Sequence, residues 1–163
     1  MDPIPSPELI SPQDLLLYNS THRVVICTTC EYAIQPAAIA RHLKEIHAIH
    51  RHHRRPYTEY ADSLDLCDPS ELLHGPFTGD FPVPGLPAIS GLQCLSPGCG
   101  HLCATAKRMQ SHWVSIHHAP GCAALDWQQV PLQTFFKGNL LRYFTHPALS
   151  VLRLPEGPEV RNL

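Results

Sequence analysis

Two cysteines and two histidines occur close together in CTTCEYAIQPAAIARHLKEIH, residues 27–47. Two residues separate Cys27 from Cys30, 11 separate Cys30 from His42, and four separate His42 from His47. A tight turn can bring two thiolates together, and a helix can offer two imidazoles about one turn apart. Zinc prefers four such ligands in a tetrahedron. The pattern therefore predicts a zinc ion that closes a small finger-like unit.

The same arrangement recurs further along the chain. Cys94 and Cys99 have four residues between them, His112 follows after 12 more, and His117 after four more. His118 stands next to His117 and also has an allowed spacing, so either of them could supply the fourth ligand. The sequence therefore predicts two zinc ions.

Apolar residues occupy the positions where small zinc fingers place core side chains. These are Ile34 and Ile39 in the first unit, and Cys103 and Met109 in the second. The chain holds 12 His and seven Cys, so a single match could be coincidence. Two full matches with the apolar positions filled favour metal. A unit of this size also needs zinc, because it cannot build a sufficient core alone.

Other local patterns predict the elements around the ligands. RVVIC (23–27) predicts a strand, and a helix is expected from Pro36 to about Arg54, ending before Pro56. Its apolar stripe is Ile39, Leu43, Ile46 and Ile49. Asp68 is expected to cap a short helix in 68–74, and Thr105 lies near the start of a helix in 104–118. Residues 130–144 predict a hairpin around KGN.

The fold class that follows is small α+β, with two zinc-stapled units of a short hairpin plus helix. Seventeen prolines among 163 residues argue against a single large core. We expect a disordered N-terminus (1–14), a first unit (15–55) and an acidic Pro/Gly-rich linker (56–91). A second unit with the C-terminal hairpin (92–146) and a loose tail (147–163) follow. The aromatic residues of the hairpin are expected to form a small core with Trp113 and Trp127.

Composition and motifs exclude several classes of protein. Each predicted zinc site has four protein ligands, whereas a catalytic zinc keeps an open position. The chain also lacks the deaminase, phosphate-loop and nucleophile-elbow motifs, so we expect no enzyme and no small-molecule substrate. No signal peptide or membrane-length apolar run is evident. We expect an intracellular protein, located in the nucleus. Cys67 and Cys122 are expected to be free thiols.

Weak DNA or RNA binding is the leading functional hypothesis. In a DNA-binding zinc finger, the residues that contact bases lie at fixed positions before the first histidine ligand. In the first helix these positions hold Gln35, Ala38 and Arg41. In the second they hold Thr105, Arg108 and Ser111, with Lys107 alongside. Phosphate contacts could come from the basic run Arg41, Lys44, Arg51, Arg54 and Arg55. The two fingers are too far apart in sequence for a tandem reader. The acidic run that follows, with Glu59, Asp62, Asp65 and Asp68, could mask the basic residues. The alternative is a protein-interaction module with purely structural zinc.

Three stretches carry a resemblance to a known family: YAIQPAAIARHL (32–43), CLSPGCGHLCATAKRMQSHW (94–113) and LQTFFKGNLLRYF (132–144). They resemble a fungal domain of unknown function, of the orsellinic acid biosynthesis cluster protein D type, over about residues 15–145. The resemblance implies two degenerate two-Cys, two-His zinc units and a link to secondary-metabolite genes, but no defined activity. Its ligands would fall on the eight Cys and His residues given above. Family members are often longer, so the chain is either a short version or a fragment.

Overall fold

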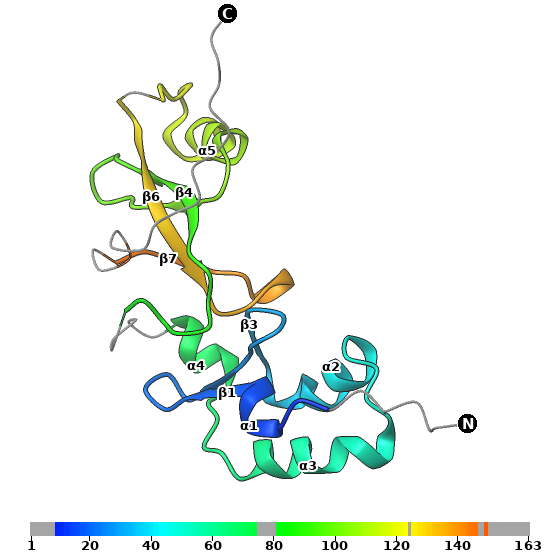
Figure 1. Ribbon diagram of the computed structural model, residues 1–163. Coiled ribbons are helices and arrows are strands. Elements are labelled where there is room, and N and C mark those ends of the chain that lie inside the picture. The colour runs from blue at the N-terminus through cyan, green and yellow to red at the C-terminus, as the bar shows by residue number, and fades with distance from the viewer. Residues whose placement is uncertain (1–8, 75–80, 124, 147–148, 150–163) are drawn as a thin grey trace, which may run out of the picture. The chain divides into compact units, whose positions relative to one another are not determined.

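The computed structural model describes residues 9–74, 81–123, 125–146 and 149 (Figure 1). The chain forms two compact units: the first comprises residues 1–80 together with 135–140, and the second comprises 81–134 together with 141–163. The small α+β class with two Cys/His groups is confirmed. The expected N-terminal disorder and loose tail fall mostly outside the described residues, although Pro12–Leu15 forms the short helix α1.

The first unit is built on a three-stranded antiparallel sheet of order β1-β2-β3. The strands are β1 (Leu16–Asn19), β2 (Val24–Cys27) and β3 (Tyr32–Ile34). Every residue of β2 is buried, which explains its unbroken run of apolar and β-branched side chains and confirms the predicted strand. The β2–β3 turn closes with a hydrogen bond from the Glu31 N–H to the Cys27 carbonyl, and Glu31 has a φ of 60°. This turn sets Cys27 and Cys30 at one end of the sheet.

The helical part of the first unit differs from the single long helix that the sequence predicts. A 3₁₀ turn, η1 (Pro36–Ala38), leads into α2 (Ile39–Glu45), and a new helix, α3 (Arg51–Asp62), starts after a break. Pro56 lies inside α3 instead of ending a helix before it. The break occurs at residues 46–50, where Ala48 has a φ of 52° and Ile46 is 57% exposed. Ile46 therefore lies outside the apolar stripe predicted for it.

Helix α3 belongs to the core of the first unit, although residues 56–62 were predicted to begin a linker. Tyr57 and Ala61 are buried in one cluster with the sheet and α2. The Tyr57 hydroxyl donates to the carbonyl of Ile10, which precedes α1 in the sequence. The cluster's buried members are Leu15, Leu16, Val25, Cys27, Ile34, Ile39, Leu43, Ile49, Tyr57 and Ala61. Further on, α4 (Pro69–His74) begins where predicted, with Asp68 accepting from the Ser70 N–H at 2.8 Å.

The second unit is built on a four-stranded sheet of order β5-β4-β6-β7. Its strands are β4 (Ile89–Cys94), β5 (Leu102–Cys103), β6 (Trp127–Thr134) and β7 (Tyr143–Phe144). The β6–β7 pairing confirms the predicted C-terminal hairpin. Gly91 is required in β4, because a Cβ there would lie 2.1 Å from Leu132 Cδ1.

One helical segment covers the core of the second unit. It consists of α5 (Ala106–His112), capped by Thr105, and a π-helical turn, η2 (Trp113–His117). Met109 and Cys103 are buried with Cys94 and Trp127, as predicted. Phe135 and Phe136 were expected in this core but belong to the first unit, where the Ala33 N–H donates to the Phe135 carbonyl at 2.7 Å. The 3₁₀ turn η3 (Gly138–Leu140) follows them.

Candidate metal centres

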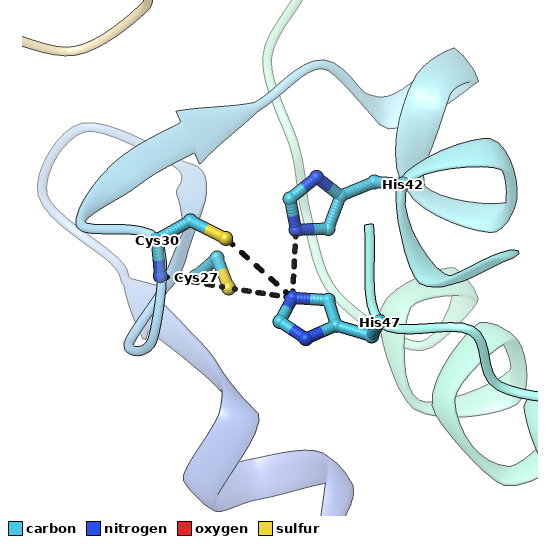
Figure 2. Close-up of side chains that lie close together, drawn as sticks. All are labelled: Cys27, Cys30, His42 and His47. Atoms are coloured by element: carbon cyan, nitrogen blue, oxygen red, sulfur yellow. Dashed lines mark hydrogen bonds between the residues drawn. The ribbon is translucent and has the colours of Figure 1, made fainter. Parts of the chain in front are cut away.

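Four side chains converge in the first unit (Figure 2). The Sγ atoms of Cys27 and Cys30 lie 3.3 Å and 3.6 Å from His47 Nε2, and His42 Nε2 lies 3.1 Å from the same atom. The β2–β3 turn supplies the two thiols, α2 supplies His42, and the segment after α2 supplies His47. The structure thus brings together all four residues that the spacing singled out.

Hydrogen bonding alone does not account for this convergence. His47 Nε2 has three close neighbours, but an imidazole nitrogen carries at most one proton. His42 and Cys27 are also buried, so solvent has little access to their polar atoms. Two thiols and two imidazole nitrogens aimed at one point are the donor set of a bound cation. The residues therefore fit a metal ion at their centre.

The second unit repeats the convergence with a different set of closest pairs. Cys99 Sγ lies 3.3 Å from His112 Nε2, Cys94 Sγ lies 3.5 Å from His117 Nε2, and the two Nε2 atoms are 3.2 Å apart. His117 and not His118 belongs to this group, because His118 ends the helix in the left-handed region with a φ of 55°. These are the two Cys/His groups that could hold a metal ion among the described residues.

The two units differ in how the backbone brings together two histidines that are five positions apart. The two His residues of each group are five positions apart, and a regular α-helix turns about 100° per residue, so it would place them about 140° apart around its axis. In the first unit, α2 ends at Glu45 and the chain turns back to bring His47 to His42. In the second unit, the π-helical turn Trp113–His117 widens the helix, and its i to i+5 bonding aligns residues five apart.

Neighbouring rings contact the histidines of both groups. The Tyr32 hydroxyl lies 3.5 Å from His42 Nδ1, the ring nitrogen that faces away from the cluster. In the second unit, the His101 ring stacks on the His112 ring with 4.1 Å between the ring centroids. The ring centroids of Trp113 and His117 are 4.3 Å apart. Such partners of a ligating His fix the orientation of its ring.

Burial sets the protonation of the ligands. It lowers the pKa of His42, with a further effect from the His47 ring, and it lowers the pKa of His47 as well. Both imidazoles therefore stay neutral, as metal binding requires. Burial also raises the pKa of the Cys27 and Cys94 thiols. A thiolate in either place needs a nearby positive charge, which a bound metal ion would supply.

The remaining thiols lie outside both groups. Cys103 is a buried core residue, and Cys67 is buried with its Sγ 3.3 Å from the His22 carbonyl. Cys122 is exposed. The seven cysteines, all within the described part of the chain, form no disulfide with one another.

The residues predicted to contact nucleic acid are distributed over both units. Gln35, Arg41 and Lys44 are exposed around α2, Arg51 and Arg55 are exposed on α3, and Arg54 there is partly buried. Lys107 and Arg108 are exposed on α5 of the second unit.

The acidic run contacts the basic run at one point. Glu59 pairs with Arg55 at 2.6 Å, whereas Asp65 pairs with Arg23 at 2.8 Å. Asp68 caps α4. Among the described residues, Glu59 is therefore the one member of the predicted mask that forms an ion pair with the basic run.

None of the helices in the described part of the chain is both long and apolar enough to cross a bilayer.

Comparisons with known proteins agree with the resemblance carried by the ligand-bearing stretches. The family model described as orsellinic acid/F9775 biosynthesis cluster protein D matches residues 14–118. A curated protein of that name from Emericella nidulans is 38% identical over 138 residues. That alignment covers 85% of this chain but 27% of the relative, so the chain spans about a quarter of the relative's length. No solved structure matches the chain.

Proposed function

The chain belongs to the family of the orsellinic acid/F9775 biosynthesis cluster protein D, and on this premise we propose that it is a non-enzymatic module stabilised by two zinc ions. Its regulatory role would be exerted through weak, backbone-directed contact with nucleic acid. The observation that carries the zinc proposal is the pair of four-residue Cys/His groups.

The spacing of the ligand atoms supports zinc. With Zn–N near 2.0 Å and Zn–S near 2.3 Å, tetrahedral geometry places two nitrogens about 3.3 Å apart and sulfur and nitrogen about 3.5 Å apart. The N–N distances in the two groups are 3.1 Å and 3.2 Å, and the S–N distances run from 3.3 Å to 3.6 Å. Two thiolates and two imidazoles are also the donor set typical of structural zinc.

The number of ligands supports a structural role for the metal. Four protein donors complete a tetrahedral shell, whereas catalytic zinc sites leave one position to water or substrate. Zinc would then stabilise the fold, at roughly 10–16 kcal/mol per site in isolated finger peptides.

Chelation tests this part of the proposal. We expect a strong chelator to abolish most of the helical circular dichroism, and added Zn²⁺ to restore it. Helical signal that survived full chelation would overturn the structural role.

Basic residues that are exposed or, for Arg54, partly buried support nucleic-acid contact of low specificity. They are Arg41, Lys44, Arg51, Arg54 and Arg55 in the first unit, with Lys107 and Arg108 in the second. If all five of the first unit reach phosphates, the log–log dependence of affinity on salt should have a slope of about −4 to −5. Absence of binding at low salt would eliminate this partner class. A nuclear location is part of the same proposal and would fall with it.

A protein-interaction module is the second candidate, and exposed apolar side chains of the second unit favour it. Val114 and Ile116 lie on the π-helical turn and are 58% and 60% exposed, and Leu125 nearby in sequence is 75% exposed. Apolar groups that gather on a surface often mark a partner site. Replacing Val114 and Ile116 with Ser should then weaken partner binding without loss of zinc.

A role in secondary metabolism follows from the relative's name alone and is part of the proposal. The Emericella nidulans protein is described by its biosynthesis cluster. Deletion of the gene for this chain, followed by comparison of the host's secondary metabolites, tests the connection. An unchanged metabolite profile under inducing conditions would contradict it.

A further inference from the structure

A pocket of about 350 Å³ lies in the first unit, beside α2. One wall is the face of α2 and its preceding turn, with Gln35, Ala38 and Arg41. The opposite wall is the segment Phe136–Gly138, which belongs to the same unit although it is about 100 residues away in sequence. Tyr32 and Ile34 of β3 also line it.

Gln35, Ala38 and Arg41, which line this pocket, are the residues of the first helix at the base-contacting positions of a DNA-binding zinc finger. A helix that reads bases enters the major groove, which is about 12 Å wide and admits little beside the helix. Here, Phe136 and Lys137 face that side of the helix across the pocket. The Ala33–Phe135 backbone hydrogen bond of 2.7 Å ties this segment to the edge of the sheet. The predicted reading face is therefore a concave site and not a free helix surface.

The pocket combines an apolar body with polar groups at its rim. Ala33, Ile34 and Phe136 are buried, and they supply apolar surface. Arg41 and Lys137 are exposed cations that line the same space, and Glu45 is the acidic residue there. Lys137 is further positioned by Tyr32, with its Nζ 5.0 Å from the ring centroid. Although Arg41 and Glu45 are four residues apart on one helix, they are not among the ion pairs of the described residues.

We propose that this pocket binds a small monocarboxylate with an apolar body, held by Arg41 and Lys137. A guanidinium and an ammonium suit a carboxylate, and charge-assisted hydrogen bonds of this kind are stronger than neutral ones. One carboxylate of the protein in the same pocket disfavours a phosphate dianion, because like charges repel at short range. The volume lies at the lower end of the range for small-molecule sites. The inference goes beyond the proposed function and does not depend on nucleic-acid binding.

The test uses the full zinc-loaded chain and two probes of nearly the same shape, benzoate and its neutral analogue benzamide. Titration at constant pH and ionic strength is followed by two-dimensional ¹H–¹⁵N NMR. We expect benzoate to shift amide signals of residues 32–46 and 136–138. The affinity for benzamide should be at least about tenfold lower than that for benzoate.

Variants assign the effect to the pocket. Arg41→Ala and Lys137→Ala should each weaken benzoate binding about tenfold. The control Lys44→Ala removes a positive charge from the same helix at a position that does not line the pocket, and should change binding less than about twofold. Glu45→Gln should tighten it. All four positions are exposed, and an unchanged zinc content will show that each variant is folded.

Three results would overturn the proposal. They are equal binding of benzoate and benzamide, equal loss in the Lys44→Ala control and the Arg41→Ala variant, or tighter binding of inorganic phosphate than of benzoate at the same amide signals. The first would show that the pocket does not recognise the charge of the carboxylate. The second would show that benzoate responds only to the net charge of the protein. The third would show that the pocket prefers phosphate to a carboxylate.

Discussion

His42 Nε2 and His47 Nε2 lie 3.1 Å apart, although five positions separate the two residues and a continuous α-helix would direct them to different sides. The end of α2 at Glu45 makes the approach possible. The equivalent pair in the second unit, His112 and His117, meets at 3.2 Å through a π-helical turn. In both units, therefore, the departure from regular helix serves the convergence of ligand atoms.

Loss of one ligand should remove one metal ion and leave the other. We expect Cys27→Ser to release the ion of the first unit and His112→Ala that of the second, because three remaining ligands leave the shell incomplete. The control Cys122→Ser changes an exposed thiol outside both groups and should keep two ions. Native mass spectrometry checks the counts. Loss of both ions in a single variant would contradict independent sites.

Acid should release the metal, and the sign follows from the histidine pKa values. Burial lowers the folded-state pKa of His42, His47 and His112 from the ordinary value of 6.5, so the unfolded chain binds more protons in the window just below that value. Stability is therefore full above about pH 6.5 and falls as the pH drops through the lowered pKa values. Zinc release from pH 8 to pH 4, followed with a chromophoric chelator, measures the effect. Release that increased as the pH rose from 6.5 to 8 would contradict the prediction.

A side chain at position 91 should destabilise the second unit. In Gly91→Ala, the new methyl group would meet Leu132 Cδ1 at 2.1 Å and the Cys103 carbonyl at 2.9 Å. Relief requires movement of a buried side chain and of β5, which typically costs about 1–3 kcal/mol. Urea unfolding of the zinc-loaded chain measures the loss, with Ser115→Ala on an exposed turn as control. A loss no larger than that of the control would show that the strand tolerates the methyl group.

Of the acidic residues that follow the basic run, we expect Glu59 alone to reduce the affinity of that run for nucleic acid. Glu59→Gln frees Arg55 from its ion pair, and should raise the affinity for a random-sequence duplex about two- to threefold at low salt. Asp65→Asn removes a charge that is paired with Arg23, away from the basic run, and serves as the control for total charge. Fluorescence anisotropy measures both. An equal gain in the two variants would mean that net charge, and not local pairing, sets the affinity.

The ligands and their supporting core were accessible from sequence because they depend on local spacing. Cys27 and Cys30 lie in one turn, and Met109 and Cys103 occupy the positions expected of finger cores. Strand 24–27 and the start of a helix near Thr105 likewise depend on local preferences for strands and helix ends.

Other features depend on contacts that local patterns do not encode. The helix break at residues 46–50 is associated with the approach of His47 to His42, and the apolar stripe continued through it without a signal. Pro56 is tolerated within α3, whose Tyr57 and Ala61 are buried in the first core. The residues Phe135–Leu140 join the first unit through contacts with β3 across about 100 positions. That contact creates the pocket beside Arg41.

The central claim is that each four-residue Cys/His group holds one zinc ion. Native mass spectrometry of the chain purified with Zn²⁺ tests it most directly. We expect two bound zinc ions per chain, with one remaining in the Cys27→Ser variant and one in the His112→Ala variant. A folded chain that carries no zinc, or two ions that persist in both variants, would contradict it.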